Sequence, residues 1–206
     1  MKTVLLSITA LMFSGALMAQ TATGAGFGVR GGVNLSNITK SGDADFSSNS
    51  KLGINAAVFL DLPLSSAIAV QPELQFSQKG YKSSGNIASS PYEYSRTSNF
   101  IEVPLLLKLK PAPVFSILVG PQFSFLTSSS TKFSTGNSSV ETEVKNDNDN
   151  LRKNILGGAL GVEATAGGAV FGLRYSLDFQ NNNGDGTSTI PKYKNQVTSL
   201  YVGFRL

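Results

Sequence analysis

The chain has 206 residues, a formal net charge of +4, and neither cysteine nor histidine. The missing cysteine excludes disulfides and thiolate chemistry, and the missing histidine removes the commonest general base and the commonest metal ligand. Lysine and arginine are scattered along the chain and form no basic stripe suited to nucleic acid. We therefore expect no enzymatic activity, no cofactor or metal, and no nucleic-acid partner.

The N-terminus has the composition of a secretory signal peptide. A lysine precedes an uncharged apolar run that closes on small residues, and the polar, glycine-rich stretch T-A-T-G-A-G follows. The sequence predicts a cleavable leader, residues 1–19, and a single mature domain, residues 20–206. Cleavage is expected after Ala19, with Ala16 and Ala22 as alternatives.

Alternation of apolar and polar residues dominates the rest of the chain. No later segment approaches the roughly 20 apolar residues of a transmembrane helix, whereas period two indicates β-strands. In N-F-I-E-V-P-L-L-L-K-L-K, one parity is wholly aliphatic and the other carries Glu102 and Lys108. Eight segments show this alternation: 27–35, 52–62, 68–80, 99–110, 115–125, 156–164, 170–179 and 198–206. Each has about the length of a strand that crosses a membrane, roughly 9–11 residues.

Short and long connections alternate between these segments. P-L-S-S, P-A-P and A-G-G read as hairpin turns. The other connections, at 36–51, 82–98, 127–154 and 180–196, are long and polar. This asymmetry is typical of outer-membrane barrels with periplasmic turns and external loops. The predicted fold is all-β: an eight-stranded antiparallel up-and-down transmembrane β-barrel preceded by a cleavable signal peptide.

A soluble, lipocalin-like barrel would also alternate, but with its apolar parity inside. Here the apolar parity is nearly free of polar residues, and the opposite parity is rich in glycine, as a narrow lumen requires. Together with the leader and the loop asymmetry, this favours the membrane barrel.

In that barrel the charged parity faces a lumen just wide enough to be filled by side chains. An unpaired buried charge destabilises a protein by roughly several kcal/mol, so we expect these charges to form ion pairs that fill the lumen as a structural plug. The cluster that we expect comprises Arg30, Glu73, Glu102, Lys108, Glu163, Arg174 and Arg205, with Lys79 and Asp178 on the same parity.

Two further expectations concern the barrel wall. Outward phenylalanines should form two interfacial bands. The bands comprise Phe27, Phe115, Phe171 and Phe204 toward the short turns, and Phe76, Phe123, Phe125 and Phe179 toward the long loops. Pro104 lacks a backbone donor in a sheet without free edges, which predicts a local bulge or a missing ladder bond.

The chain resembles the PorT-like outer-membrane β-barrel family. The segments that carry the likeness are G-V-R-G-G-V-N, Q-P-E-L-Q-F-S-Q-K-G-Y, N-F-I-E-V-P-L-L-L-K, G-L-R-Y-S-L-D and L-Y-V-G-F-R-L. The resemblance implies an integral outer-membrane barrel without catalytic residues. The family's founding member is linked to assembly of a dedicated protein-secretion system.

The leading functional prediction is a closed, non-enzymatic barrel in the cell outer membrane, whose long loops bind something outside or which stabilises the envelope. The alternatives are a PorT-like secretion accessory, a narrow channel and a soluble carrier. The expected partners are outer-membrane lipid, the barrel-assembly machinery during insertion, and secretion-system or surface proteins. We expect the protein to be a monomer.

Overall fold

The computed structural model describes residues 25–40, 48–87, 90–135, 138–144, 151–183 and 192–206. The predicted signal peptide, residues 1–19, lies outside this part of the chain. The strands in the described part are β1 (Gly26–Lys40), β2 (Asn49–Pro63), β3 (Ile68–Ile87), β4 (Ser90–Ala112), β5 (Phe115–Thr135), β6 (Ser138–Val144), β7 (Asn154–Ala166), β8 (Ala169–Asp178) and β9 (Tyr193–Arg205). Among these residues, no helix has the length and apolar content required to cross a bilayer.

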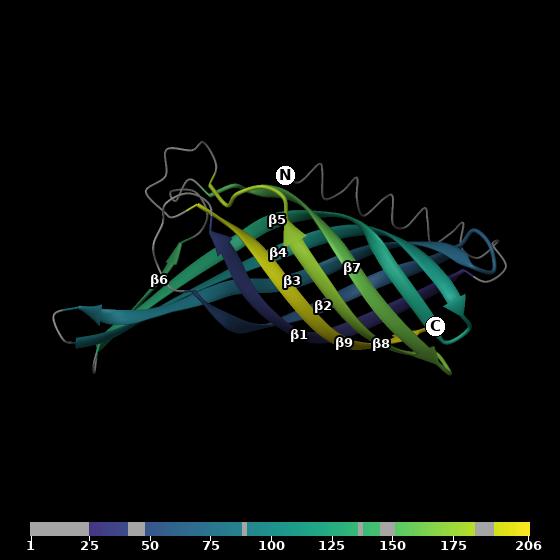
Figure 1. Cartoon of the computed structure of the whole chain (residues 1–206), viewed down its shortest axis with the longest axis horizontal. Coiled ribbons are helices and arrows are strands. Elements are labelled where there is room, and N and C mark those ends of the chain that lie inside the picture. Colours follow the sequence, from purple (N-terminus) through teal and green to yellow (C-terminus); the bar gives the residue numbers. More distant parts are fainter. Residues whose placement is uncertain (1–24, 41–47, 88–89, 136–137, 145–150, 184–191) are drawn as a thin grey trace.

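Eight of the strands close into a ring. The order is β4-β3-β2-β1-β9-β8-β7-β5, the neighbours are antiparallel, and β4 pairs with β5 to complete the circuit. The first and last strands meet along their length, from Gly28 beside Arg205 to Lys40 beside Tyr193. Figure 1 shows the tilted wall that results. The predicted eight-stranded antiparallel barrel is confirmed.

Tight turns connect the strands at one end, which we call the turn end. The turn between β7 and β8 consists of Gly167 and Gly168, with φ of 56° and 87°. A two-residue hairpin with positive φ at both positions matches the twist of its strands and disfavours side chains, which explains the A-G-G signal. The turns between β2 and β3 and between β4 and β5 are also short, as predicted.

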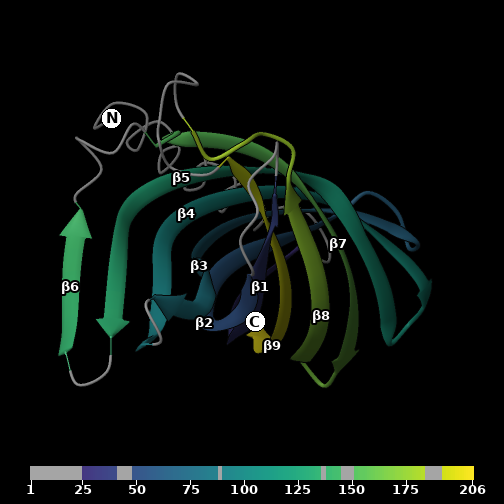
Figure 2. The same ribbon diagram turned by 60° about the vertical axis from the view of Figure 1, so that its left-hand side comes forward.

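The opposite end, the loop end, differs from the prediction. Segments 82–98 and 127–154 were predicted to be loops, but β3, β4 and β5 run through much of them and β6 follows. Both segments are rich in serine and threonine, and 82–98 also contains two tyrosines; these residues pair well across strands although they form no apolar parity. We call residues 82–87, 90–98, 127–135 and 138–144 the extension. It projects beyond the barrel, toward the left in Figure 1 and the lower left in Figure 2.

The two faces of the wall separate as the alternation predicts. Aliphatic side chains such as Leu160, which is 56% exposed, point outward all round the ring, whereas the charged parity points inward and is buried. Continuous exposed apolar surface suits hydrocarbon and not water. Both sets of predicted phenylalanines lie on the outward parity, and Phe27, Phe171, Phe123 and Phe179 are among the most exposed. The arrangement contradicts a soluble carrier with an apolar interior.

Pro104 interrupts the ladder without a bulge. The pairing of β4 with β3 passes from Pro72 beside Leu105 to Gln75 beside Glu102 with no shift of register. Pro104 has no partner in β3, although it pairs with Gln122 of β5. The chain accommodates the missing donor by losing pairing at this point.

Candidate functional site

The barrel interior holds charges in equal number. Five cationic and five anionic side chains are buried within the described part of the chain. They are Arg30, Lys79, Arg96, Lys108 and Arg174, and Asp61, Glu73, Glu102, Glu163 and Asp178. In a low-dielectric interior such charges persist only when they are paired and hydrogen-bonded.

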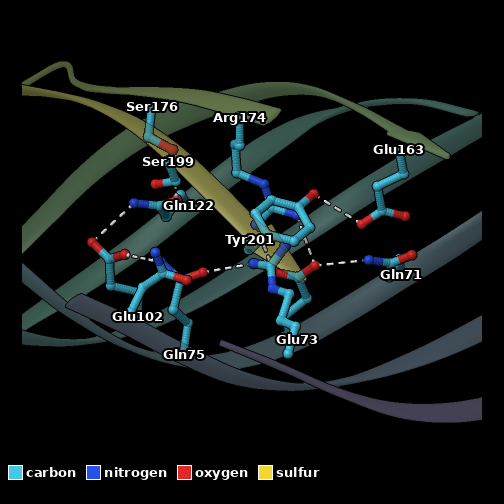
Figure 3. A network of polar contacts seen from close by, with 12 residues as sticks. Gln71, Glu73, Gln75, Glu102, Gln122, Glu163, Arg174, Ser176, Ser199 and Tyr201 are labelled. Carbon is cyan, nitrogen blue, oxygen red and sulfur yellow. Dashed lines mark hydrogen bonds and ion pairs between the residues drawn. The ribbon is translucent and has the colours of Figure 1, made fainter. Parts of the chain in front are cut away.

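Glu73 occupies the centre of this network (Figure 3). Arg174 approaches it with two nitrogens, at 2.7 Å to Oε2 and 2.9 Å to Oε1. Arg30 donates to the same Oε2 at 2.6 Å, and Gln71 donates to Oε1 at 2.8 Å. The carboxylate thus receives four hydrogen bonds, three of them from guanidinium groups, and bonds between ionised partners are the stronger kind.

Glu102 forms a second centre toward the loop end. Lys79 lies 2.8 Å from its Oε1, which also accepts bonds from Gln122 at 2.9 Å and from Ser124 at 2.8 Å. Gln75 joins the two centres, because it accepts a bond from Arg30 and donates to Glu102. Lys79 also contacts Asp178 at 3.2 Å, which links β8 to β3 and β4.

Lys108 forms the third centre, toward the turn end. Its Nζ lies 2.9 Å from Glu163, 3.5 Å from Asp61 and 3.0 Å from Gln71, which connects it to Glu73. The Tyr201 hydroxyl donates to Glu163 at 2.9 Å. A single chain of contacts therefore spans the lumen.

The aromatic ring of Tyr201 packs against the cations. The Arg30 guanidinium carbon lies 4.2 Å from the ring centroid and that of Arg174 lies 5.4 Å away, both within cation–π range. The ring has room because Gly172 faces it: a Cβ on that residue would lie 2.2 Å from the tyrosine ring. The glycines on the inward parity thus make space for large side chains.

Apolar and tyrosine clusters close both ends of the network. At the loop end Tyr81 and Tyr193 meet edge to face at 5.3 Å and pack with Ile38 and Tyr94. Four apolar residues from β4, β5, β7 and the segment before β7 pack beside them: Phe100, Leu126, Leu151 and Ile155. At the turn end Phe59, Val170 and Tyr201 pack together. The interior is therefore filled along its length.

The structure brings the predicted cluster residues into this network. Arg30, Glu73, Glu102, Lys108, Glu163 and Arg174 are all buried. Arg205 lies at the turn end with its side chain 30% exposed, and its guanidinium lies 3.4 Å from Asp61 of the network. Sequence reasoning did not include Asp61 and Arg96 in the cluster, nor the neutral linkers Gln71, Gln75 and Gln122. All of them occupy the inward parity, which is the signal that could have found them.

The hydroxyl of Ser124 is engaged by the network. It donates to Glu102, which also pairs with Lys79. The chain contains no histidine to activate such a hydroxyl. The ion pairs and hydrogen bonds of the network connect opposite walls of the barrel and fill the space between them.

Comparison with solved structures gives matches at low identity. Ail, the attachment invasion locus protein of Yersinia pestis, is 14% identical over 88% of this chain and 99% of its own, with a TM-score of 0.47. Neisserial surface protein A is 12% identical over 89% and 99%, with a TM-score of 0.48. The outer membrane protease OmpT from Escherichia coli is 8% identical over 88% and 96%, with a TM-score of 0.44. No curated protein sequence gives a significant match.

The family assignment rests on a sequence comparison. The family model for the outer membrane protein beta-barrel domain matches residues 18–198 and thus covers most of the chain. This range includes almost all of the barrel. Of the lumen network, it leaves out the residues after 198, such as Tyr201 and Arg205. The chain therefore belongs to the outer membrane protein beta-barrel domain family, and it resides in the cell outer membrane.

Proposed function

We propose that this protein is a closed, non-enzymatic outer-membrane barrel that presents its extension to a protein partner outside the cell. The observation that carries the proposal is the filled lumen: among the described residues, buried ion pairs and tyrosines occupy the space inside the ring. A protein that neither conducts nor catalyses acts through its surfaces. Short turns face the periplasm in such barrels, so the extension lies outside.

One face of the extension is aromatic and partly exposed. Tyr94 pairs with Phe133, which in turn pairs with Val140, so the three lie on the same face of β4, β5 and β6. Phe133 is 37% exposed, Val140 is 65% exposed, and the Tyr92 ring stacks on Phe133 at 5.9 Å. Exposed aromatic anchors are what protein interfaces use.

The sheet order supports the same surface. β6 stands at the end of the sheet order, and within the described part of the chain it pairs with β5 alone. An edge strand presents backbone donors and acceptors that a partner's extended segment can pair with. A protein partner can therefore use the aromatic face and the edge together.

Conductance tests the closed lumen. Purified protein reconstituted in planar bilayers should give no single-channel steps, because the buried charges pair across the lumen. Reproducible unitary steps would show an open pore and contradict the proposal.

Site-specific photo-cross-linking in intact cells tests the binding surface. A photoreactive amino acid at Phe133 should capture a defined protein, and Phe133→Ser should abolish binding of that protein. The matched control is Lys132, which is also exposed but lies on the opposite face of β5. Equal capture from both positions, or capture from neither, would contradict a binding role for this face.

A second candidate is a PorT-like accessory of a protein-secretion system, favoured by the sequence motifs and by exposed apolar residues at the periplasmic turns, Leu64 and Val114. Deletion of the gene should then stop export of secretion-system substrates while other outer-membrane proteins remain at normal levels. Normal export would exclude this role.

Under either candidate we propose a monomer inserted by the barrel-assembly machinery.

A further inference from the structure

The barrel wall is lower over one pair of strands at the loop end. β8 ends at Asp178 and β7 begins at Asn154, whereas their neighbours β9 and β5 continue to Tyr193 and Thr135. The last pair between β8 and β9 is Leu177 with Gln196, and the last between β7 and β5 is Asn154 with Phe125. Near these points a groove lies on each side of the β7–β8 hairpin.

The β8–β9 groove has a volume of about 450 Å³. Its walls include Tyr175 and Leu177 on the outward face of β8, Phe179 directly after β8, and Lys194 and Gln196 on the outward face of β9. Tyr175 donates its hydroxyl to Gln196 at 3.0 Å. No ion pair or hydrogen bond of the Lys194 ammonium is formed within the described residues. The groove therefore combines an apolar wall with an available cation.

The β5–β7 groove has a volume of about 390 Å³ and similar chemistry. Phe123 and Phe125 supply the apolar wall, and Arg152 and Gln180 supply the polar groups. The Nε of Arg152 donates to the Asn181 carbonyl at 3.1 Å, which orients the guanidinium. Its two terminal nitrogens have no protein partner in the part of the chain that the structure describes. A planar guanidinium held in this way suits an oxyanion.

Among the described residues, the charges that border both grooves favour an anion. No carboxylate borders the β5–β7 groove among the residues described. Asp178 borders the β8–β9 groove, but Lys79 and Asn195 engage its two oxygens at 3.2 and 2.6 Å. The lumen network thus holds this carboxylate, and Lys194 dominates the outward charge.

The position of the grooves identifies the anion. Phe123, Phe125 and Phe179 belong to the aromatic band toward the loop end, and such bands lie at the level of the lipid headgroups. The protein resides in the outer membrane, and the apolar wall of each groove continues the lipid-facing surface. A ligand here has acyl chains below the aromatic band and its charged group above it.

We propose that the two grooves bind phosphorylated lipid headgroups of the outer leaflet, with Lys194 and Arg152 contacting phosphate and the phenylalanines contacting the first acyl carbons. The lipid is held on the outside of the wall, and the lumen takes no part. The proposal rests on the membrane location and not on the function proposed above.

The test uses the full-length protein in phosphatidylethanolamine bicelles with diphosphorylated lipid A as the probe. Native mass spectrometry measures the fraction of protein that retains lipid A. The double variant Lys194→Gln/Arg152→Gln should lower retention by about tenfold, and each single variant by less. The matched control is Lys82→Gln/Lys132→Gln, which removes the same charge from the extension and should retain lipid A as the wild type does.

Two further arms complete the experiment. Lys194→Arg/Arg152→Lys keeps both charges and should keep retention within about threefold, which separates lost charge from misfolding. Inorganic phosphate at the same concentration should not displace lipid A, because the acyl chains contribute to binding. Unchanged retention in the double Gln variant, an equal loss in the control, or full displacement by phosphate would overturn the proposal.

Discussion

Arg174 and Glu73 meet across the lumen, 101 residues apart in the sequence, through two hydrogen bonds of 2.7 and 2.9 Å. Arg174 stands on β8 and Glu73 on β3, which are not neighbours in the ring. The pair therefore adds a contact that the backbone ladder does not supply. It holds two sides of the barrel at a fixed distance.

Neutralising Glu73 should destabilise the barrel strongly. Glu73→Gln preserves the shape of the side chain but leaves Arg30 and Arg174 buried without a carboxylate. We expect the free energy of unfolding to fall by about 3–5 kcal/mol, measured by urea titration in lipid vesicles with far-ultraviolet circular dichroism. Glu93→Gln, which breaks an exposed pair with Lys82, is the control and should cost below about 1 kcal/mol. Equal losses in the two variants would argue against the network as the source of stability.

Adding a methyl group inside the lumen should also destabilise the barrel. A Cβ at Gly28 would lie 2.2 Å from the Phe59 ring, so Gly28→Ala forces that ring to move, at a cost of about 1–3 kcal/mol. Gly31→Ala is the matched control, because its nearest neighbour would be 3.8 Å away. Gly28→Ala/Phe59→Leu should recover part of the loss in the same unfolding assay. A neutral Gly28→Ala would contradict tight filling of the lumen.

A charge on the outer face should be costly in proportion to depth. Leu160 lies on the outward face midway between the pairs of Leu156 with Phe123 and of Ala164 with Phe115, which mark the two aromatic bands. Leu160→Arg should reduce the free energy of unfolding in vesicles by about 2–4 kcal/mol, and Leu156→Arg by about 0–1 kcal/mol. If both substitutions cost the same, the bands do not mark the membrane boundaries.

Removing one buried hydroxyl isolates a single bond of the network. Tyr201→Phe leaves Glu163 without the donor that lies 2.9 Å away and should cost about 1.5–3 kcal/mol. Tyr175→Phe removes a hydroxyl that bonds Gln196 on the exposed face, and it should change stability by less than about 1 kcal/mol. Thermal gel-shift assays of the folded and unfolded forms provide the comparison. A larger loss in Tyr175→Phe would contradict this ranking.

The ring could be predicted from the sequence because period two carries two kinds of information. It indicates strands, and it assigns each residue to a face, so Leu160 was expected outside and Glu163 inside. The extension escaped prediction because Tyr92 to Ser98 and Ser128 to Thr135 lack an aliphatic parity. Polar strands are stabilised by side chains on neighbouring strands, and the sequence alone does not show which residues become neighbours.

The network was predictable as a set of residues but not as a set of pairs. Parity placed Glu73 and Arg174 inside, yet which charges meet depends on strand tilt and stagger around the ring. Asp61 lies on the inward parity near the end of its strand, and its contacts with Lys108 and Arg205 depend on how other strands are placed. The grooves beside β7 and β8 depend on where strands end, and strand boundaries are the weakest element of a sequence prediction.

The pairing of β1 with β9 determines how the barrel comes apart. Asn34 on β1 accepts a bond from Ser199 on β9 at 2.7 Å, across 165 residues of sequence. Contacts between residues so far apart in sequence form late in folding, because the chain must first lose the conformational entropy of closing the whole loop. Separation of β1 from β9 in a bilayer would expose unpaired backbone groups and the charged side chains of the lumen to hydrocarbon. This cost arises before the chain gains conformational entropy by unfolding. Opening of this seam therefore faces a large free-energy barrier, and such a barrier contributes to kinetic stability in the membrane.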